Sequence, residues 1–132
     1  MQESGGSQGT VLIVDDDAEL RALVAGVVGG LGCRVLEAAD GPAALRAVAA
    51  TRPDLVLLDL SMPGMDGVAL AAELRRRFDR TGLPMVMLSA HGGPDDEARA
   101  LGAGCSLYER KPCPPSRLRD IVRGMLPPQR GS

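Results

Sequence analysis

The stretch LVLLDLSMPGMDG, at Leu55–Gly67, decides the fold of this chain. It starts with an unbroken apolar run, Leu55–Leu58, which is typical of a strand buried on both faces of a sheet. Asp59 follows this run, and the turn-forming segment Ser61–Gly64 comes next. This order predicts a carboxylate at the carboxyl end of a central strand, where open α/β sheets bind their ligands.

The rest of the chain repeats a pattern of one short strand followed by one helix. Further apolar runs predict strands at Thr10–Val14, Cys33–Ala38, Pro84–Leu88 and Cys105–Glu109. Helices are expected after Asp17, from Gly41 to Ala50, from Val68 to Phe78, at Asp95–Leu101 and from Pro114-Pro115 onward. Strands and helices that alternate in this way form a mostly parallel sheet with helices on both faces. The predicted fold class is therefore a doubly wound α/β sandwich of the (βα)5 type.

Helical spacing also predicts which side chains face the sheet. The expected inward residues are Leu20, Leu23, Val24, Val27 and Leu31 in the first helix, Val68, Ala71, Leu74 and Phe78 in the third, Ala98 and Leu101 in the fourth, and Leu118, Ile121, Val122 and Met125 in the last. Asp17, Asp40 and Asp66 are expected to cap helix N-termini. The run Arg75–Arg77 is expected to be solvated.

Composition limits the class of protein. The chain has 132 residues, 45% of them hydrophobic, which predicts one globular domain at residues 10–126 between polar tails at 1–9 and 127–132. A net charge of −2 argues against direct nucleic-acid binding. The sequence has no apolar run near the ~20 residues that cross a bilayer, so no membrane contact is expected. The three cysteines lack metal-type spacing, and without a signal-peptide pattern they predict reduced thiols and a cytoplasmic location.

Polar side chains follow four of the predicted strands. They are Asp15 and Asp16, Asp59, Ser89, and Lys111. Because parallel strands end at one edge of a sheet, we expect these side chains to converge. Crowded carboxylates repel one another unless a cation lies among them, and their hard oxygens suit Mg²⁺, or Mn²⁺ in its place. Lysine and serine suit phosphoryl oxygens. The set predicts a site for an aspartyl phosphate.

The motifs that carry these residues are the acidic pair after VLIV, DLSMPGMDG, SAH and YERKP. In this order and at these spacings they resemble the CheY-like receiver domain of two-component response regulators, over about Thr10–Leu126. The resemblance implies a flavodoxin-like sheet in the order 2-1-3-4-5. It also implies a signalling switch that takes part in its own phosphotransfer and dephosphorylation and is not a multiple-turnover enzyme.

Roles for single residues follow from the resemblance alone. Asp59 is implied to accept a phosphoryl group from a sensor histidine kinase or a phosphotransfer protein. Asp16 is implied to ligate Mg²⁺ directly and Asp15 mainly through water, with Asp59 and the backbone carbonyl of Ser61 as further ligands. Lys111 is implied to pair with the phosphoryl group, and the Lys111-Pro112 bond is expected to be cis.

The resemblance further implies a switch at the last two strands. Ser89 and Tyr108 are its implied residues, and the side chain of Ser61 and His91 are implied to tune the lifetime of the phosphoryl group. The surface of the fourth helix, fifth strand and last helix is implied to control a downstream protein, with a phosphorylation-dependent homodimer as one outcome. Cys113 stands where the family commonly has phenylalanine, which favours a packing substitution over a reactive thiol.

Other interpretations remain open from the sequence. Asp15 and Asp17 form a D-x-D pair that resembles the haloacid dehalogenase phosphatases. A receiver-like binding module that works without phosphorylation is a third hypothesis. Ser89 fits a plain strand-end hydroxyl, Tyr108 fits static core and His91 fits a solvated loop histidine.

Overall fold

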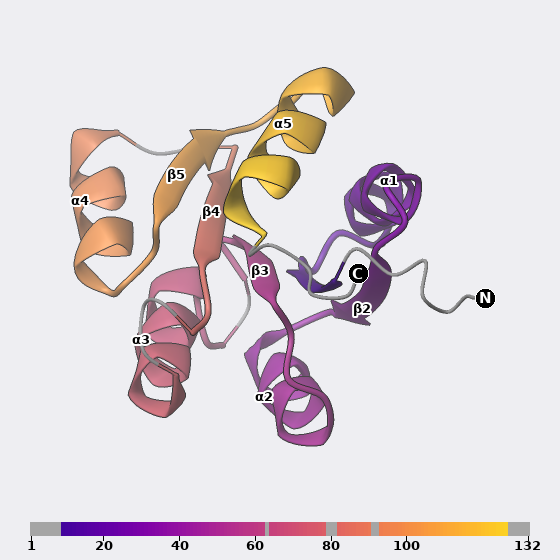
Figure 1. Ribbon diagram of the computed structural model, residues 1–132. Coiled ribbons are helices and arrows are strands. Elements are labelled where there is room, and N and C mark those ends of the chain that lie inside the picture. The colour runs from indigo at the N-terminus through magenta and orange to yellow at the C-terminus, as the bar shows by residue number, and fades with distance from the viewer. Residues whose placement is uncertain (1–8, 63, 79–81, 91–92, 127–132) are drawn as a thin grey trace.

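The computed structural model describes residues 9–62, 64–78, 82–90 and 93–126, so the two predicted tails lie almost wholly outside the described residues. Strands and helices alternate along the chain (Figure 1). The elements are β1 (Thr10–Val14), α1 (Ala18–Gly29), β2 (Arg34–Ala38), α2 (Gly41–Ala50), β3 (Leu55–Asp59), α3 (Gly67–Arg77), β4 (Met85–Ser89), α4 (Pro94–Gly102), β5 (Leu107–Arg110) and α5 (Pro115–Met125).

The five strands form one parallel sheet in the order β2-β1-β3-β4-β5. This confirms the predicted fold class and strand order. The apolar run Leu55–Leu58 lies in the central strand β3, and all five residues of this strand are buried. Strand bounds differ from the prediction by one or two residues, since β2 begins at Arg34 and β5 at Leu107.

Each face of the sheet carries its own hydrophobic core. Helices α2, α3 and α4 pack on one face, over side chains such as Leu12, Leu58 and Met87. Helices α1 and α5 pack on the other, over Ile13 and Leu57 (Figure 1). Neighbouring residues of a strand point to opposite faces, so the continuous apolar strands supply both cores.

The predicted acidic caps are confirmed. Asp17 accepts hydrogen bonds from the backbone N–H groups of Glu19 and Leu20 at the start of α1. Asp40 and Asp66 each accept one, at 2.8 Å, in the first turns of α2 and α3. These contacts satisfy N–H groups that have no partner within the helix, and they fix where three helices begin.

The inward face predicted for α1 is partly wrong. Leu20 and Leu23 are 38% and 67% exposed, and Val28 is the buried residue of this helix. The first half of α1 faces a groove of about 570 Å³, which both leucines line together with Pro112, Pro115 and Leu118. Val24, Val27 and Leu31 pack partly buried against the core on this face, so the predicted stripe is covered in its second half and open in its first.

Two other side-chain predictions are corrected by the structure. In α4, Ala98 and Leu101 are exposed and Ala100 is the buried residue. In α3, Arg75 is half-buried instead of solvated. Its guanidinium donates to the backbone carbonyls of Phe78, Leu83 and Gly104, at 3.1, 2.9 and 2.7 Å. These backbone acceptors compensate the charge for its partial burial.

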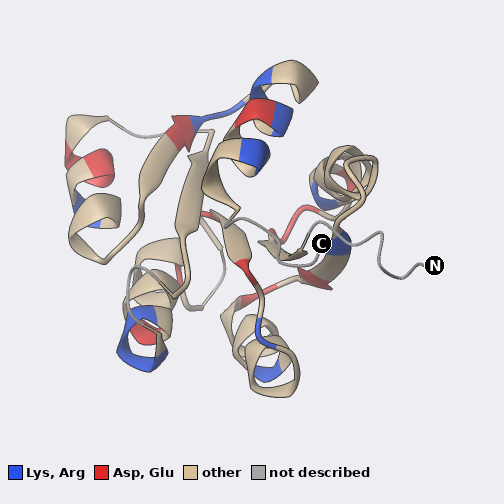
Figure 2. Cartoon of the chain, viewed as in Figure 1, with Lys and Arg blue, Asp and Glu red and all other residues tan. Residues whose placement is uncertain are grey.

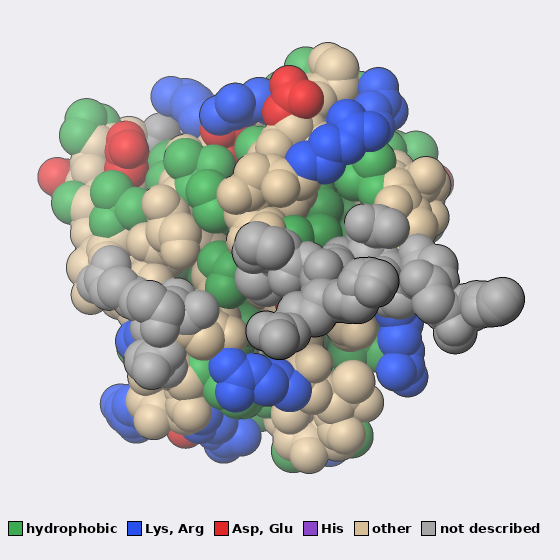
Figure 3. Space-filling view, viewed as in Figure 1, with side chains coloured by type: hydrophobic (Ala, Val, Ile, Leu, Met, Phe, Trp, Pro, Cys, Tyr) green, Lys and Arg blue, Asp and Glu red, His purple; other side chains and the backbone are tan. Residues whose placement is uncertain are grey.

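Charge is unevenly placed over the surface. Figure 2 shows basic residues along α5 and at the end of α3, and Figure 3 shows hydrophobic surface beside the basic side chains of α5. None of the helices that the structure describes is long and apolar enough to cross a lipid bilayer.

Candidate functional site

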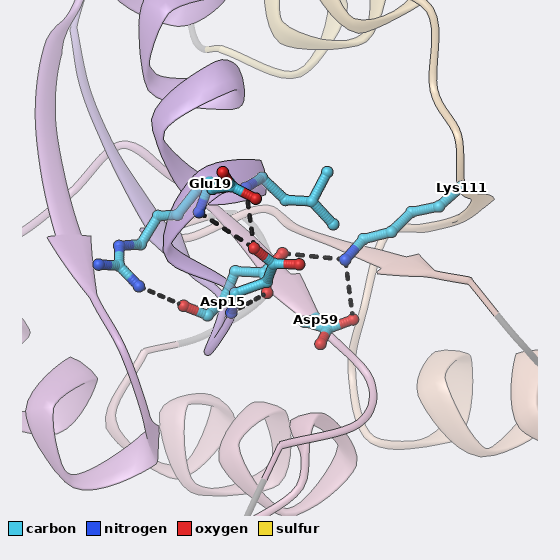
Figure 4. Close-up of polar contacts among 7 residues, drawn as sticks. Asp15, Glu19, Asp59 and Lys111 are labelled. Atoms are coloured by element: carbon cyan, nitrogen blue, oxygen red, sulfur yellow. Dashed lines mark hydrogen bonds and ion pairs between the residues drawn. The ribbon is translucent and has the colours of Figure 1, made fainter.

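The predicted site residues that the structure describes gather at the carboxyl edge of the sheet. Asp59 and Ser89 are the last residues of β3 and β4, Asp15 and Asp16 follow β1, and Lys111 follows β5. In Figure 4, the side chains of Lys111 and Asp59 point toward one another, with Asp15 beside them. The convergence expected from the strand ends is therefore observed. His91, predicted to tune the phosphoryl lifetime, lies outside the described residues.

Lys111 bridges two of the carboxylates. Its Nζ lies 2.9 Å from Asp15 Oδ2 and 3.2 Å from Asp59 Oδ1 (Figure 4). The side chain of Lys111 is only 14% exposed, that of Asp15 8% and that of Asp59 11%. Charge-assisted contacts that are shielded from water in this way are stronger than surface ion pairs.

Burial and neighbouring charges shift two pKa values at this site. Burial raises the pKa of the Asp59 carboxyl, Lys111 offsets part of this effect, and the charge of Asp15 adds to the rise. Burial lowers the pKa of Lys111, but its hydrogen bond to Asp15 and the charge of Asp59 outweigh burial and raise it overall. The ionised form of Asp59 is thus disfavoured by burial, and a further cation beside it would favour that form.

The acidic residues fit a metal ion of the magnesium type. Carboxylate oxygens of Asp15, Asp16 and Asp59 all lie within 4.8 Å of one another. Asp16 is exposed, and with Ser61 it lines an open hollow at the end of β3. Several carboxylate oxygens with access to solvent suit Mg²⁺, which keeps part of its water shell.

Local backbone contacts place Asp59 and Lys111. The N–H of Gly67 donates to the carbonyl of Leu60 at 2.8 Å, which ties the start of α3 to the end of β3. A Cβ at Gly67 would overlap the backbone carbonyl of Asp59, so this close approach requires glycine. On the other side, the N–H of Lys111 donates to the carbonyl of Ser89 at 2.7 Å. The Lys111-Pro112 bond is cis, as expected.

The predicted switch residues lie on adjacent strands. Ser89 is 2% exposed at the end of β4. Tyr108 is half-buried on β5, pairs in register with Met87, and packs against the core on the α2–α3–α4 face. It also lines a hollow with Pro94 and Glu97 of α4. Since this position suits both static packing and a movable side chain, the switch role of Tyr108 stays a prediction.

Cys113 packs partly buried against the core on the α1–α5 face. Burial raises the pKa of its thiol and the charge of Glu109 raises it further, with Arg117 acting in the opposite direction. Because the thiolate is the reactive form, a raised pKa favours the packing interpretation of this residue.

Sequence reasoning missed two arginines next to the site. Arg21 of α1 donates through Nη1 to the backbone carbonyl of Asp15 at 2.6 Å. Arg99 of α4 lies 3.5 Å from Asp66, the residue that caps α3. The only sequence signal for Arg21 is a charged residue between apolar positions of the first helix, one turn after its cap.

Comparison with known proteins agrees with this geometry. The family model described as the response regulator receiver domain matches residues 11–123. The chemotaxis protein CheY4 of Vibrio cholerae has the same fold, with a TM-score of 0.85 and 28% identity over 91% of this chain and 100% of that one. NtrX of Brucella abortus matches with a TM-score of 0.83 and 32% identity, over 89% of this chain and 26% of NtrX.

Curated relatives include longer proteins. The DNA-binding response regulator MtrA of Mycolicibacterium paratuberculosis is 41% identical over 88% of this chain and 50% of MtrA. The phosphate regulon transcriptional regulatory protein PhoB of Pseudomonas aeruginosa is 36% identical over 89% of this chain and 51% of PhoB. The chain thus spans about half the length of these relatives.

These names correct the partner prediction, which named only proteins and excluded direct nucleic-acid binding. That prediction is wrong because it rested on the net charge of −2, and the relatives that this chain matches over about half their length are named DNA-binding or transcriptional regulators. The charge of one segment carries no information about what the rest of a longer regulator binds.

Family match, fold neighbours and converging strand-end residues all give the same assignment. Proteins of this class are regulatory domains of two-component signalling, controlled by phosphorylation, and they use Mg²⁺ through an acidic cluster. The chain belongs to the response regulator receiver domain family.

Proposed function

We propose that Asp59 accepts a phosphoryl group from a sensor histidine kinase or a phosphotransfer protein, in a reaction that depends on Mg²⁺. One observation carries this proposal. Asp59 lies at the end of the central strand, in contact with the Lys111 ammonium and within 4.8 Å of two more carboxylates. The functional unit is proposed to span residues 10–126.

The transfer is a displacement at phosphorus. A carboxylate oxygen of Asp59 forms the new O–P bond while the P–N bond to the donor histidine breaks, and the imidazole leaves. Asp15, Asp16, Asp59 and the backbone carbonyl of Ser61 would hold Mg²⁺, which supplies positive charge against the phosphoryl oxygens. Because Asp59 is buried in part, water is limited around the reacting oxygen and the electrostatic contacts there are strengthened.

Lys111 and Ser89 respond to the new group. The Nζ that pairs with Asp15 and Asp59 in the structure would turn toward a phosphoryl oxygen, and the buried hydroxyl of Ser89 would donate to another. Movement at Ser89 would open space for Tyr108 on the neighbouring strand and so change the surface of α4, β5 and α5. The Ser61 side chain and His91 are proposed to tune how long the phosphoryl group lasts.

The output is proposed to be control of transcription. The support is that relatives matched over about half their length are named DNA-binding or transcriptional regulators. The reading frame that encodes the chain tests this, because it should encode a DNA-binding segment or lie beside a gene for one. A neighbourhood without either would contradict a transcriptional output and leave the phosphorylation chemistry unaffected.

The phosphatase alternative loses one residue of its D-x-D pair. The carboxylate of Asp17 caps α1, where it accepts hydrogen bonds from two backbone N–H groups. It is therefore engaged in a structural role and not aimed at the site as an acid or base. The binding module that works without phosphorylation is separated from our proposal by the following experiment.

Incubation with acetyl phosphate and Mg²⁺ tests the acceptor. We expect one acid-labile phosphoryl group on the wild-type chain by intact mass spectrometry, and none on Asp59→Asn. Asp120→Asn on the exposed side of α5 is the control and should be modified like wild type. Equal modification of Asp59→Asn would reject Asp59 as acceptor, and a wild-type chain that stays unmodified would favour the binding module.

A further inference from the structure

The backbone of Asp15 is held from a side that the proposed phosphotransfer does not use. Arg21 Nη1 donates to the Asp15 carbonyl at 2.6 Å, while Arg21 Nε pairs with Glu37 Oε1 of β2 at 3.1 Å. The Arg21 side chain is 19% exposed and that of Glu37 is 45% exposed. The arginine therefore lies under the acidic loop, and the glutamate fixes it from the solvent side.

The position of Arg21 in α1 explains this reach. Helical side chains lean toward the N-terminus of their helix, and Arg21 lies one turn inside α1, directly after the loop that carries the acidic residues. The planar guanidinium presents Nε and Nη1 in a fixed fork, so one side chain contacts the carboxylate and the carbonyl together. A lysine ammonium would carry the same charge without this fork.

The contact orients Asp16 as well as Asp15. The Asp15 carbonyl belongs to the planar peptide that joins the two residues, so holding this oxygen fixes the direction in which Asp16 leaves the loop. Asp16 is exposed, and within the described part of the chain its side chain makes no hydrogen bond. Its carboxylate is placed by its backbone.

The contact is also independent of Lys111. Lys111 shares its ammonium between Asp15 and Asp59, and a phosphoryl group would compete for it. Arg21 uses the main-chain oxygen of Asp15 and leaves the carboxylate alone. The acidic loop thus keeps a fixed contact when the lysine turns away.

We propose that Arg21, oriented by Glu37, is a positioning residue that preorganises Asp15 and Asp16 to bind Mg²⁺. This inference rests on the proposed function, since it concerns the metal of that site. Charge and geometry act in opposite directions here. A cation near the site disfavours Mg²⁺ by repulsion, whereas a fixed loop favours Mg²⁺ by lowering the cost of arranging its ligands. Arg21 favours Mg²⁺ only where the geometric effect is the larger one, and a variant that keeps the charge measures this.

Arg21→Lys separates the two effects because it keeps the charge and loses the fork. Titration of the metal-free chain with Mg²⁺ alone, in a calorimeter, should give about tenfold weaker binding than wild type, which is at the low end for residues that support metal ligands. Glu37→Gln keeps an acceptor for Arg21 Nε and should bind within about twofold of wild type. Unfolding midpoints without metal are measured in parallel.

Arg117→Lys is the matched control. Arg117 forms a similar forked contact with Glu109, at 3.2 and 3.1 Å, and within the described part of the chain it makes no hydrogen bond to the acidic loop. Its Mg²⁺ affinity should equal that of wild type. If Arg21→Lys does not fold, Glu37→Ala replaces it, because it leaves the charge of Arg21 in place without its orienting partner; about threefold weaker binding is then expected.

Three results would overturn the inference. Wild-type affinity in Arg21→Lys, or in Glu37→Ala where that variant replaces it, would show that the contact does not position the ligands. A loss of affinity that appears only with a loss of folded structure would show a purely structural role. A wild-type chain that binds no Mg²⁺ would reject both this inference and the proposed function. The first result, obtained with a wild-type chain that does bind Mg²⁺ and is phosphorylated, would reject the inference and leave the proposed function intact.

Discussion

The segment from β3 to α3 and the segment from α4 to β5 are built very differently. Every residue of β3 is buried, and α3 has four buried residues and a side-chain cap at its start. In α4 only Ala100 is buried, and no side chain caps the helix. The residues of β5 are half-buried or exposed. The proposed phosphoryl acceptor thus lies in the well-packed segment, and the proposed responding surface lies in the sparsely packed one.

This difference suits a division in which the proposed chemistry and the proposed response belong to separate parts of one small sheet. An acceptor needs fixed neighbours, because the electrostatic contacts that assist phosphoryl transfer depend on geometry. A responding element needs two arrangements of similar free energy, and segments with few buried contacts open most easily. If Asp59 is phosphorylated as proposed, a modest change in free energy there would shift α4 without disturbing Asp59 itself.

Contacts at the two ends of α4 predict which half moves. Beyond its C-terminal end, the N–H of Cys105 donates to the carbonyl of Ala100, and Arg75 donates to the carbonyl of Gly104. Among the described residues, α4 also forms an ion pair between Arg99 and Asp66 of the α3 cap, in which both side chains are about half exposed, and such pairs contribute little. We expect movement to concentrate in the first turns of α4.

Replacing glycine by alanine in each segment should affect stability very differently, and Gly67→Ala should have the largest effect. Gly67→Ala places a methyl group on the backbone of Asp59 and 2.9 Å from the sulfur of Met87, so the acceptor strand or α3 must shift. We expect a loss of about 2 kcal/mol in the free energy of unfolding, measured with urea. The rate of phosphorylation by acetyl phosphate should fall as well, because Asp59 moves.

Gly102→Ala in α4 is the counterpart. No heavy atom lies within 4 Å of a Cβ at this position, and alanine favours helix over glycine, so a gain of about 0.5 kcal/mol is expected. Equal losses in the two variants would contradict the contrast between the segments.

The sequence was sufficient for the parts of this contrast that depend on local pattern. The apolar run before Asp59 predicted the central strand, and Asp17, Asp40 and Asp66 predicted three helix starts, because burial on both faces and N-capping involve neighbours in the chain. Convergence of the strand ends followed from parallel topology. These features need only periodicity and sheet geometry.

The sequence was insufficient where distant segments decide the environment. Helical spacing could not show that the stripe of α1 meets an open groove at Leu23, or that Ala100 and not Leu101 anchors α4. It also gave no sign that Arg75 and Arg21 donate to backbone carbonyls. Such contacts depend on where a loop passes, and side-chain type alone does not encode that.

The cap of α3 should produce the next largest effect. Asp66→Ala removes the acceptor for the N–H of Ala69 and should cost about 1 kcal/mol of unfolding free energy. Asp66→Asn keeps the cap and loses only the ion pair with Arg99, so it should cost a few tenths of a kcal/mol at most. Urea unfolding of the two variants measures both values. An asparagine variant as unstable as the alanine variant would show that α3 depends on its contact with α4, and the two segments would then not be separate.

Adding a cap to α4 should have the smallest and most local effect. Gly93 precedes α4 in an extended conformation with φ −129° and ψ −161°, and no heavy atom lies within 4 Å of a Cβ there. Serine at this position can accept from the first free N–H groups of the helix, which stabilises it by about a few tenths of a kcal/mol over glycine. In Gly93→Ser, amide hydrogen exchange should slow by about twofold in α4 and stay unchanged in α3. The proposed response requires α4 to rearrange. When Asp59 is phosphorylated, the ring resonances of Tyr108 should therefore change less in this variant than in the wild-type chain. Unchanged exchange in α4 would mean that the start of this helix is already held as firmly as that of α3, and the absence of a side-chain cap would then not make α4 the easier helix to rearrange.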